Sequence, residues 1–302
     1  MRMTGDNDLL PIPILYGPTA TGKSARALEM AREKPCVIIN ADAMQCYDAL
    51  PVLTAQPSTQ DRGQAPHKLY GIIPPERDMT VIDWLKLAEQ EIREALKRRQ
   101  QPILVGGTGF YIKALMQGLS PVPDIPSDIR ARAEEIHQRD GLEPLIDDLA
   151  AYDPGVIEAI DVQNPRRVIR AWEVLEHTGQ SLQEWQADQP AEPPCPDLSF
   201  ELVPIIRPRP ELNQRIDNRF DEMMEKGAMD EVQKLQQCVE AGEVPETALI
   251  LKAHGYRPLS AALRGDISRA EAVARTRTET KQYAKRQMTW LRSQFDVDIS
   301  NV

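Results

Sequence analysis

The chain has 302 residues, which is enough for one large domain or two modest ones. It is 41% hydrophobic and 27% charged, as globular proteins are, and its net charge of −10 disfavours indiscriminate binding to polyanions without excluding a local basic face. Four scattered cysteines, with no C-x-x-C pair, suggest neither a disulfide framework nor a zinc site and favour the cytoplasm, and the sequence predicts neither a signal peptide nor a membrane span.

The first recognisable feature is an apolar run at Ile12–Tyr16, predicted as a buried strand, which leads into a glycine-rich loop and a helix over 25–32. Strand, Gly-x-x-x-x-Gly-Lys-Ser and helix together indicate a P-loop, whereas a chance glycine-rich turn would lack these flanks. In a P-loop, backbone N–H groups and the helix start bind an anion, Lys23 adds a charge, and the Ser24 hydroxyl can ligate Mg²⁺. The predicted phosphate-binding residues are Gly17, Pro18, Thr19, Ala20, Thr21, Gly22, Lys23 and Ser24.

Two further strand ends are predicted to carry polar residues into the same crevice. The apolar run 36–39 is followed by Asp42, which can act as a magnesium ligand, a general base or a helix N-cap; the neighbouring P-loop favours the first two roles. The run 102–105 ends in a second loop, Gly-Gly-Thr-Gly at 106–109. We expect the Thr108 hydroxyl to bond a ligand oxygen, although it could simply hold a turn.

The alternation of strands and helices predicts an α/β fold, with a P-loop NTPase-like core, a mostly parallel sheet and a helical insertion domain. The core is predicted at 1–123 and 199–302, and the insertion at 124–198. Further expected elements of the core are a strand at 69–73, a capped helix from Thr80 to about 99, an edge strand at 202–206 marked by Pro204, and helices at 211–226 and 268–292. The insertion is expected to contain a helix capped by Ser127 and ended by Gly141, a helix from Pro165 ended by Gly179, a capping box at Ser181, and a proline-rich linker at 189–196.

Basic residues concentrate near the end of the chain, where residues 257–292 hold nine Lys or Arg against three acids. Tyr283 and Trp290 are interleaved with these cations, which favours stacking on unpaired nucleic-acid bases over the alternative of a merely solvated helix face. A second basic cluster lies at 166–170 in the insertion. The four histidines have no metal-ligand spacing, and we assign them no role.

Six segments, at 17–24, 40–47, 106–111, 164–170, 252–257 and 283–292, resemble in order the motifs of the bacterial tRNA dimethylallyltransferase (tRNA isopentenyltransferase) family. The resemblance implies transfer of a dimethylallyl group from dimethylallyl diphosphate to N6 of adenosine 37, beside the tRNA anticodon, giving N6-(dimethylallyl)adenosine. It implies a P-loop that holds diphosphate instead of ATP, Asp42 as general base, Thr108 near the scissile oxygen, and Arg215 and Arg219 assisting the diphosphate.

The resemblance also implies binding of the tRNA anticodon stem–loop. We further expect a monomer that uses Mg²⁺. Three positions, Lys68, His254 and Lys281, depart from the family's usual residues. The implied tRNA-contacting residues are Asp42, Ala43, Met44, Gln45, Thr108, Arg130, Arg166, Arg167, Val168, Ile169, Arg170, Lys252, Gly255, Tyr256, Arg257, Lys281, Lys285, Arg286, Gln287, Trp290 and Arg292.

Two other functions are compatible with parts of the sequence. A small-molecule kinase would also need a P-loop, magnesium and Asp42, but it would bind ATP and would not need the basic clusters. A non-catalytic RNA-binding NTPase would keep the basic surfaces, but Asp42 and Thr108 would be dispensable for its activity.

Overall fold

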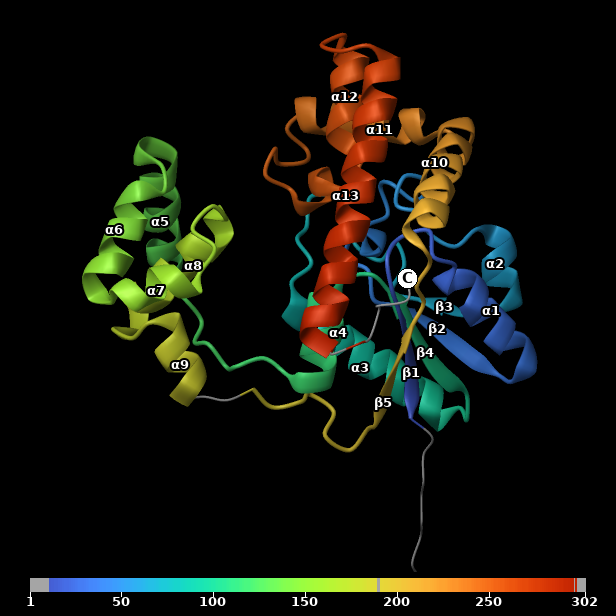
Figure 1. Ribbon diagram of the computed structural model, residues 1–302, viewed down its shortest axis with the longest axis horizontal. Coiled ribbons are helices and arrows are strands. Elements are labelled where there is room, and N and C mark those ends of the chain that lie inside the picture. The colour runs from blue at the N-terminus through green and yellow to red at the C-terminus, as the bar shows by residue number, and fades with distance from the viewer. Residues whose placement is uncertain (1–10, 189–190, 296, 298–302) are drawn as a thin grey trace, which may run out of the picture. The chain divides into compact units, whose positions relative to one another are not determined.

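The computed structural model describes residues 11–188, 191–295 and 297 (Figure 1). Residues 1–10, and Gln189 and Pro190 of the predicted linker, lie outside the described residues. The chain divides into two compact units, one formed by the residues up to Met116 and from Pro194 on, the other by Gln117–Pro193. The second unit is therefore inserted into the sequence of the first, which we call the core unit.

Within the described residues the core unit contains a five-stranded parallel sheet with the order β3-β2-β4-β1-β5. This confirms the predicted α/β class, and β5 lies at the edge beside β1, as Pro204 indicated. The strands are β1 (Ile12–Tyr16), β2 (Cys36–Asn40), β3 (His67–Lys68), β4 (Gln101–Gly106) and β5 (Phe200–Pro204).

The strand predicted at 69–73 is wrong, because the short β3 ends just before it. Leu69 and Gly71 have φ angles of 65° and 60°, in the left-handed region, so the chain cannot continue as an extended strand. The Gly71 N–H donates to the carbonyl of Gln45 at 2.9 Å. The apolar character of this segment reflects packing, since Leu69, Tyr70 and Ile73 are buried.

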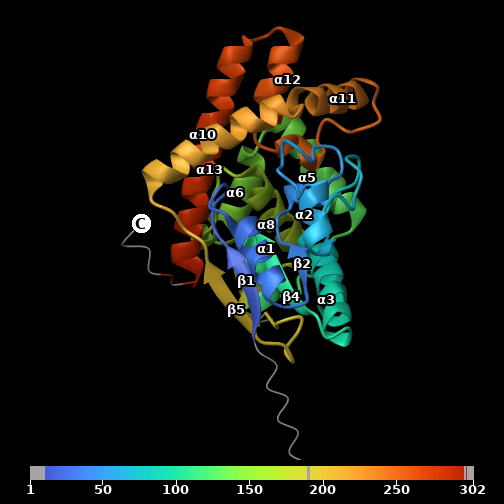
Figure 2. The same ribbon diagram turned by 90° about the vertical axis from the view of Figure 1, so that its right-hand side faces the viewer.

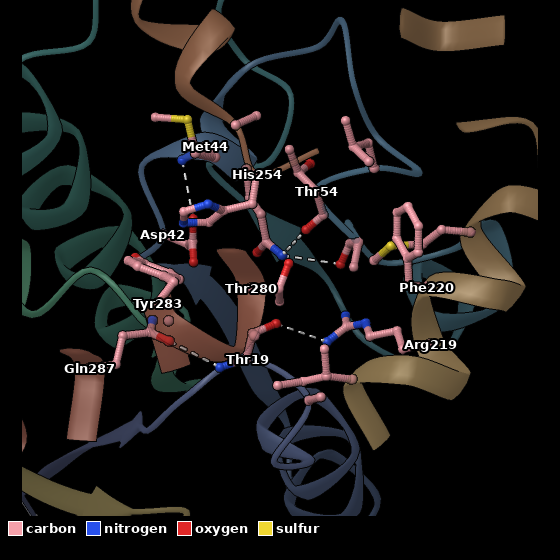
Figure 3. A pocket seen from close by; sticks show the side chains of 18 of the residues that line it. Thr19, Asp42, Met44, Thr54, Arg219, Phe220, His254, Thr280, Tyr283 and Gln287 are labelled. Atoms are coloured by element: carbon pink, nitrogen blue, oxygen red, sulfur yellow. Dashed lines mark hydrogen bonds between the residues drawn. The ribbon is translucent and has the colours of Figure 1, made fainter. Parts of the chain in front are cut away.

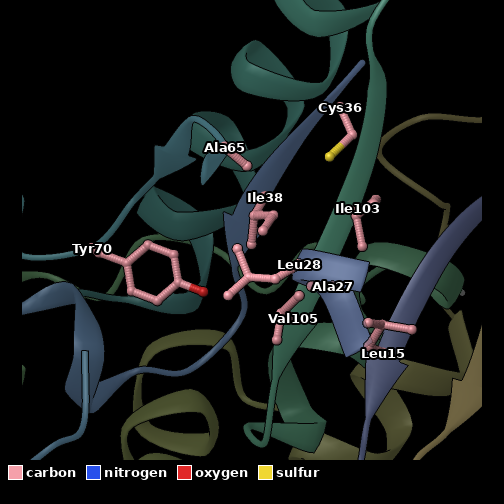
Figure 4. Packing of buried hydrophobic residues seen from close by; sticks show 9 residues of the cluster. All are labelled: Leu15, Ala27, Leu28, Cys36, Ile38, Ala65, Tyr70, Ile103 and Val105. Carbon is pink, nitrogen blue, oxygen red and sulfur yellow. The ribbon is translucent and has the colours of Figure 1, made fainter. Parts of the chain in front are cut away.

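Helices cover both faces of the sheet. Helix α1 (Lys23–Glu33) packs Ala27 and Leu28 against a cluster that includes Leu15, Ile38 and Ile103 (Figure 4). Right-handed crossovers place α3 (Val81–Lys97) on the opposite face. The predicted capping box at its start is present, and its fully buried Trp84 stacks on Tyr111 of α4 (Gly109–Gln117) with ring centroids 4.6 Å apart.

The second part of the core unit, which runs from Pro194 on, is mainly helical. Helix α13 (Arg269–Phe295) lies against α10 (Arg209–Glu225) and α12 (Tyr256–Arg264) (Figure 2). The contact with α10 includes ion pairs from Lys281 and Arg277 to Asp217, and a further pair from Arg277 to Asp221. The remaining described elements of the core unit are α2 (Thr59–Gln64), α11 (Ala228–Glu240) and the 3₁₀ turns η1 (Met44–Cys46) and η2 (Leu249–Lys252).

The inserted unit is a helical bundle with its own apolar core, in which Leu145, Leu149, Val168 and Trp172 are buried. Gly141 and Gly179 follow α5 and α8 as predicted, and Ser181 forms a capping box with Glu184. Ser127 is not a cap: it lies in the first turn of α5, and Pro126 precedes it without a side-chain bond. The helices are α5 (Ser127–Asp140), α6 (Glu143–Tyr152), α7 (Pro154–Ala159), α8 (Pro165–Thr178) and α9 (Leu182–Asp188).

Candidate active site

A cavity of about 260 Å³ opens beside the carboxyl ends of β1, β2 and β4, where ligands bind in open α/β sheets (Figure 3). It brings together segments from both parts of the core unit. Its walls come from the P-loop, the turn after β2, a loop at 53–55, helix α10, η2 and helix α13. Its polar and charged lining side chains include Thr19, Lys23, Ser24, Asp42, Gln45, Thr54, Arg219, Lys252, His254, Thr276, Thr280, Tyr283 and Gln287.

The P-loop has the backbone that its sequence predicts. Ala20 and Gly22 have φ angles of 63° and 101°, which curl the loop ahead of the first turn of α1. A Cβ at Gly17 would lie 2.1 Å from the carbonyl oxygen of Ile205, just after β5, so the loop and this residue can approach closely only because residue 17 is glycine. Nζ of Lys23 donates to the carbonyls of Gly17 and Pro18 at 2.8 and 2.7 Å. The lysine is therefore fixed across the loop.

Three arginines bond to this loop from the second part of the core unit. Nε of Arg215 donates to the Ala20 carbonyl at 2.7 Å, and Nη1 of Arg219 lies 3.5 Å from the Thr19 hydroxyl. Arg207, to which the sequence analysis gave no role, donates to the Thr21 carbonyl at 3.2 Å. Its position just past β5, the strand that pairs with β1, could have indicated this. Together the arginines place positive charge around an anion-binding loop.

Asp42 is held in a tight turn after β2. Its N–H donates to Oδ1 of Asn40 at 2.9 Å, and its own Oδ1 accepts from the Met44 N–H at 3.1 Å. Burial raises the pKa of Asp42, while Lys23, backbone N–H groups and Arg219 oppose that shift. Burial also lowers the pKa of Lys23 to about 7, against the effect of Asp42. A carboxylate with a raised pKa accepts a proton more readily, which suits a general base.

Thr108 ties the second glycine-rich loop to the Asp42 turn. Its Oγ1 accepts from the Ala43 N–H at 2.9 Å, and its own N–H donates to the Ala41 carbonyl at 3.2 Å. A Cβ at Gly106 would lie 2.0 Å from that same carbonyl oxygen, so a larger residue would push the two segments apart. With the Thr108 oxygen used as an acceptor, its proton is available for donation to a ligand.

The predicted RNA-contacting residues of α13 separate into two groups. Lys285, Arg286 and Arg292 are exposed, and Lys285 and Arg286 border a shallow hollow on the outer face of the helix. Gln287 is only 4% exposed and lies in the cavity wall. Lys281 pairs with Asp217 at 2.7 Å. One sequence motif therefore contributes residues both to the exposed face of α13 and to the wall of the cavity.

Segments 43–45 and 252–257 also border the cavity. Nε2 of Gln45 donates to the carbonyls of Thr54 and Ala55, while Met44 and Lys252 line the wall. Of the other predicted contacts in these segments, Ala43 is half-buried, Gly255 starts α12 with φ 97°, Tyr256 is buried and Arg257 is exposed.

His254 also lines the cavity, although the sequence analysis assigned no histidine a role. Its ring packs on Tyr283 with centroids 4.4 Å apart, and burial, with Arg286 nearby, lowers its pKa to about 4. The imidazole is therefore neutral near pH 7. In the sequence, this position could be noticed because its histidine differs from the residue that is usual in the family.

The predicted contacts in the inserted unit have mixed exposure. Arg130, Arg166 and Arg167 are exposed, and Arg170 is partly buried beside Glu173 at 3.4 Å. Val168 is fully buried and Ile169 packs against the same core, so their side chains hold the bundle together. Within this unit, the arginines are the residues available to a polyanion.

The described residues contain neither a metal-binding cluster of His, Cys, Asp and Glu side chains nor a membrane-spanning helix. No group of three or more His, Cys, Asp and Glu side chains among them could hold a metal ion. No helix in that part of the chain is both long and apolar enough to cross a membrane.

Comparisons with known proteins agree with these features. The family described as "IPP transferase" matches residues 45–294, and "Isopentenyl transferase" matches residues 11–70. The tRNA dimethylallyltransferase of Paramagnetospirillum magneticum is 43% identical over 96% of this chain and 90% of its own length. The crystal structure of the tRNA isopentenylpyrophosphate transferase from Bacillus halodurans is 30% identical, with a TM-score of 0.64, covering 96% of this chain and 92% of that one.

A eukaryotic dimethylallyltransferase crystallised while acting on tRNA shares the fold, with a TM-score of 0.80 at 24% identity over 96% of this chain and 72% of that one. The match to the IPP transferase family, over residues 45–294, covers more than half of the chain. The chain therefore belongs to the IPP transferase family, the tRNA dimethylallyltransferases.

Proposed function

We propose that the protein transfers the dimethylallyl group of dimethylallyl diphosphate to N6 of adenosine 37 in tRNA. The observation that carries this proposal is the cavity that Lys23, Arg219 and Asp42 share, because it combines cationic groups that suit a diphosphate with a partly buried carboxylate of raised pKa. Apolar side chains of Leu53, Ile216, Phe220 and Met223 line the same cavity and suit a prenyl tail. Family membership supports the same assignment.

The donor's diphosphate would lie on the P-loop, with charge supplied by Lys23 and Arg219. Magnesium suits this arrangement because it binds few protein oxygens together with substrate phosphates and waters, and the exposed Ser24 hydroxyl lines the cavity. Bound there, the ion would neutralise charge that develops on the diphosphate. Arg215, which bonds to the P-loop backbone, would hold the loop in shape.

In the reaction, the bond between the allylic carbon and the diphosphate oxygen breaks, and the diphosphate keeps the electron pair. The N6 amine forms the new carbon–nitrogen bond, and Asp42 accepts the proton that the amine loses. Thr108 can donate its hydroxyl proton to an oxygen near the break. The target adenine must leave the stacked loop to reach the cavity.

For the RNA, we propose the anticodon stem–loop as the bound element. The exposed cations Lys285 and Arg286 in α13, and Arg166 and Arg167 in α8, are the candidate phosphate contacts. The predicted monomer and the cytoplasmic location remain parts of this proposal, and light scattering of the purified protein would test the first.

The proposal can be tested with labelled donors and matched RNA acceptors. The protein is incubated with dimethylallyl diphosphate carrying label in the prenyl group, or with γ-labelled ATP, and with anticodon stem–loops that have adenosine or guanosine at position 37. We expect prenyl label to move only to the adenosine-containing RNA. Transfer of phosphate from ATP to a small molecule would favour a kinase, and RNA binding without any transfer would favour a non-catalytic NTPase.

A further inference from the structure

Gln287 is a buried residue of α13, and both ends of its amide are bonded within the protein; Figure 3 shows its bond to Thr19. Its Oε1 accepts from the Thr19 N–H in the P-loop at 3.1 Å. Its Nε2 donates to the Gly107 carbonyl in the second glycine-rich loop at 2.8 Å. One side chain thus joins two loops that lie 88 residues apart in sequence.

We infer that Gln287 is a positioning residue that sets the spacing of the two glycine-rich loops, and not a residue that contacts RNA. This inference deepens the proposed function and rests on it. In that reaction the P-loop would bind the diphosphate, and the second glycine-rich loop would hold Thr108 beside the Asp42 turn.

The surroundings of Gln287 fit an amide that bridges. A Cβ at Gly107 would lie 2.2 Å from Nε2 of Gln287, so the amide can reach the carbonyl only because residue 107 is glycine. The Tyr16 hydroxyl lies 3.5 Å from the Gln287 carbonyl, and the Trp290 ring meets Tyr16 edge-on with centroids 6.2 Å apart. These contacts fix the rotation of α13 and therefore the direction of the Gln287 side chain.

Each bonded loop leads directly to groups of the reaction. Thr19 is held on its other side by Arg219, which lies 3.5 Å from its hydroxyl. Gly107 precedes Thr108, whose oxygen accepts from Ala43 beside Asp42. Gln287 therefore connects the diphosphate side of the cavity to the carboxylate side. A displacement of about 1 Å between reacting groups can slow a reaction roughly 100-fold.

The amide is suited to this position because it offers a donor and an acceptor in one plane. Methionine has a similar length and would preserve burial while removing both bonds. Asparagine would keep the amide but is one methylene too short to reach both loops. Gln282 is exposed on the outer face of the same helix, so Gln282→Met is a matched control.

The test compares Gln287→Met, Gln287→Asn and Gln282→Met in the full chain. We expect both Gln287 variants to lower the single-turnover transfer rate at saturating RNA and donor by about 10-fold to 100-fold. Their affinity for inorganic diphosphate with magnesium should fall, while their dissociation constant for an anticodon stem–loop should stay within about twofold of wild type. Gln282→Met should match wild type in rate and diphosphate affinity.

The opposite pattern would overturn the inference: weaker RNA binding by the Gln287 variants, with unchanged diphosphate affinity and an unchanged rate at saturating RNA. Failure of the proposed function has a different signature, because the wild-type protein would then transfer no prenyl label. The comparison of inorganic diphosphate affinities would still report whether Gln287 shapes the P-loop.

Discussion

The two faces of helix α13 use neighbouring residues for different purposes. On the inner face, Thr280, Tyr283 and Gln287 line the cavity. On the outer face, Lys285 and Arg286 are exposed beside a shallow hollow. Successive helical residues point about 100° apart, so a continuous motif is not a continuous surface. The comparison teaches that membership of one motif does not give its residues one role.

The two faces should also respond differently to substitution. Polar groups inside the core unit act in a low dielectric environment, where losing a partner is costly. Exposed cations are screened by salt, and each contributes little alone. Variants of the cavity should therefore change the chemical step or donor binding, whereas variants of the outer face should change RNA affinity and its dependence on salt.

The largest effect is expected for Asp42→Asn on the cavity side. Loss of a general base should slow single-turnover transfer by roughly 100-fold to 10,000-fold, while RNA affinity changes little, since asparagine keeps the shape. Rapid quench of prenyl transfer measures the rate, and the exposed Asp48→Asn is the control. Substantial recovery at raised magnesium, with weaker diphosphate binding, would make Asp42 a metal ligand instead. A wild-type rate would leave it as a turn residue.

The second largest effect is expected for Lys23→Met. Removal of a charged donor from the P-loop should weaken dimethylallyl diphosphate binding by about 10-fold to 100-fold, as for hydrogen bonds to charged groups worth about 1.5–3 kcal/mol. Calorimetry measures the affinity, and exposed Lys34→Met provides the comparison. RNA affinity should be unaffected. Equal donor affinity in the two variants would exclude Lys23 from diphosphate binding.

A smaller effect, and one of a different kind, is expected on the outer face. Lys285→Ala with Arg286→Ala should weaken stem–loop binding roughly tenfold at low salt. Since each lost phosphate contact reduces the slope of log affinity against log salt by about 0.7–0.9, the slope should fall by up to about 1.4–1.8. Arg166→Ala with Arg167→Ala should behave similarly.

Fluorescence anisotropy over a salt series measures both quantities for the outer-face variants. Donor affinity should stay at the wild-type level. Arg275→Ala removes an exposed arginine that pairs with Glu271 on the same helix, and serves as the control. An unchanged slope would mean that Lys285 and Arg286 form only a solvated face.

The smallest effect concerns protons taken up when the donor binds. Because burial lowers the pKa of Lys23 to about 7, most of this lysine is neutral at pH 8 in the free protein. A bound diphosphate favours the charged form, so binding at pH 8 should take up nearly one proton, and affinity should fall about fivefold from pH 7 to pH 8. Calorimetry in buffers of different ionisation enthalpy measures the uptake, which should vanish in Lys23→Met.

Much of the fold followed from local patterns. Buried strands read as continuous apolar runs, and the P-loop, capping boxes and terminal glycines each follow from nearby residues. One exception was the segment after β3, where the apolar run at 69–73 marked packing and positive φ at Leu69 prevented a strand. Another was Ser127, which lies in the first turn of α5 and does not cap it. Apolar content shows that a segment is buried, but it does not show which other elements of the fold cover it.

The site was predictable where a motif implied its own geometry, as at Lys23 and Asp42. It was not predictable where distant segments meet. Arg207 reaches the P-loop only because β5 pairs with β1, and Gln287 turns inward only because of how α13 packs. The tertiary fold sets such contacts, and no short stretch of sequence contains them.

The bond between Gln287 and Thr19 joins residues 268 positions apart, which has a consequence for biosynthesis. At about 5–20 residues per second, a ribosome needs roughly 13–54 s between making the P-loop and making the glutamine that holds it. During that interval the nascent chain carries an unfinished catalytic centre. Chains stalled at a codon before α13 should therefore bind inorganic diphosphate poorly, and tight binding by such chains would contradict this. Translation itself thus delays activity until α13 has been made.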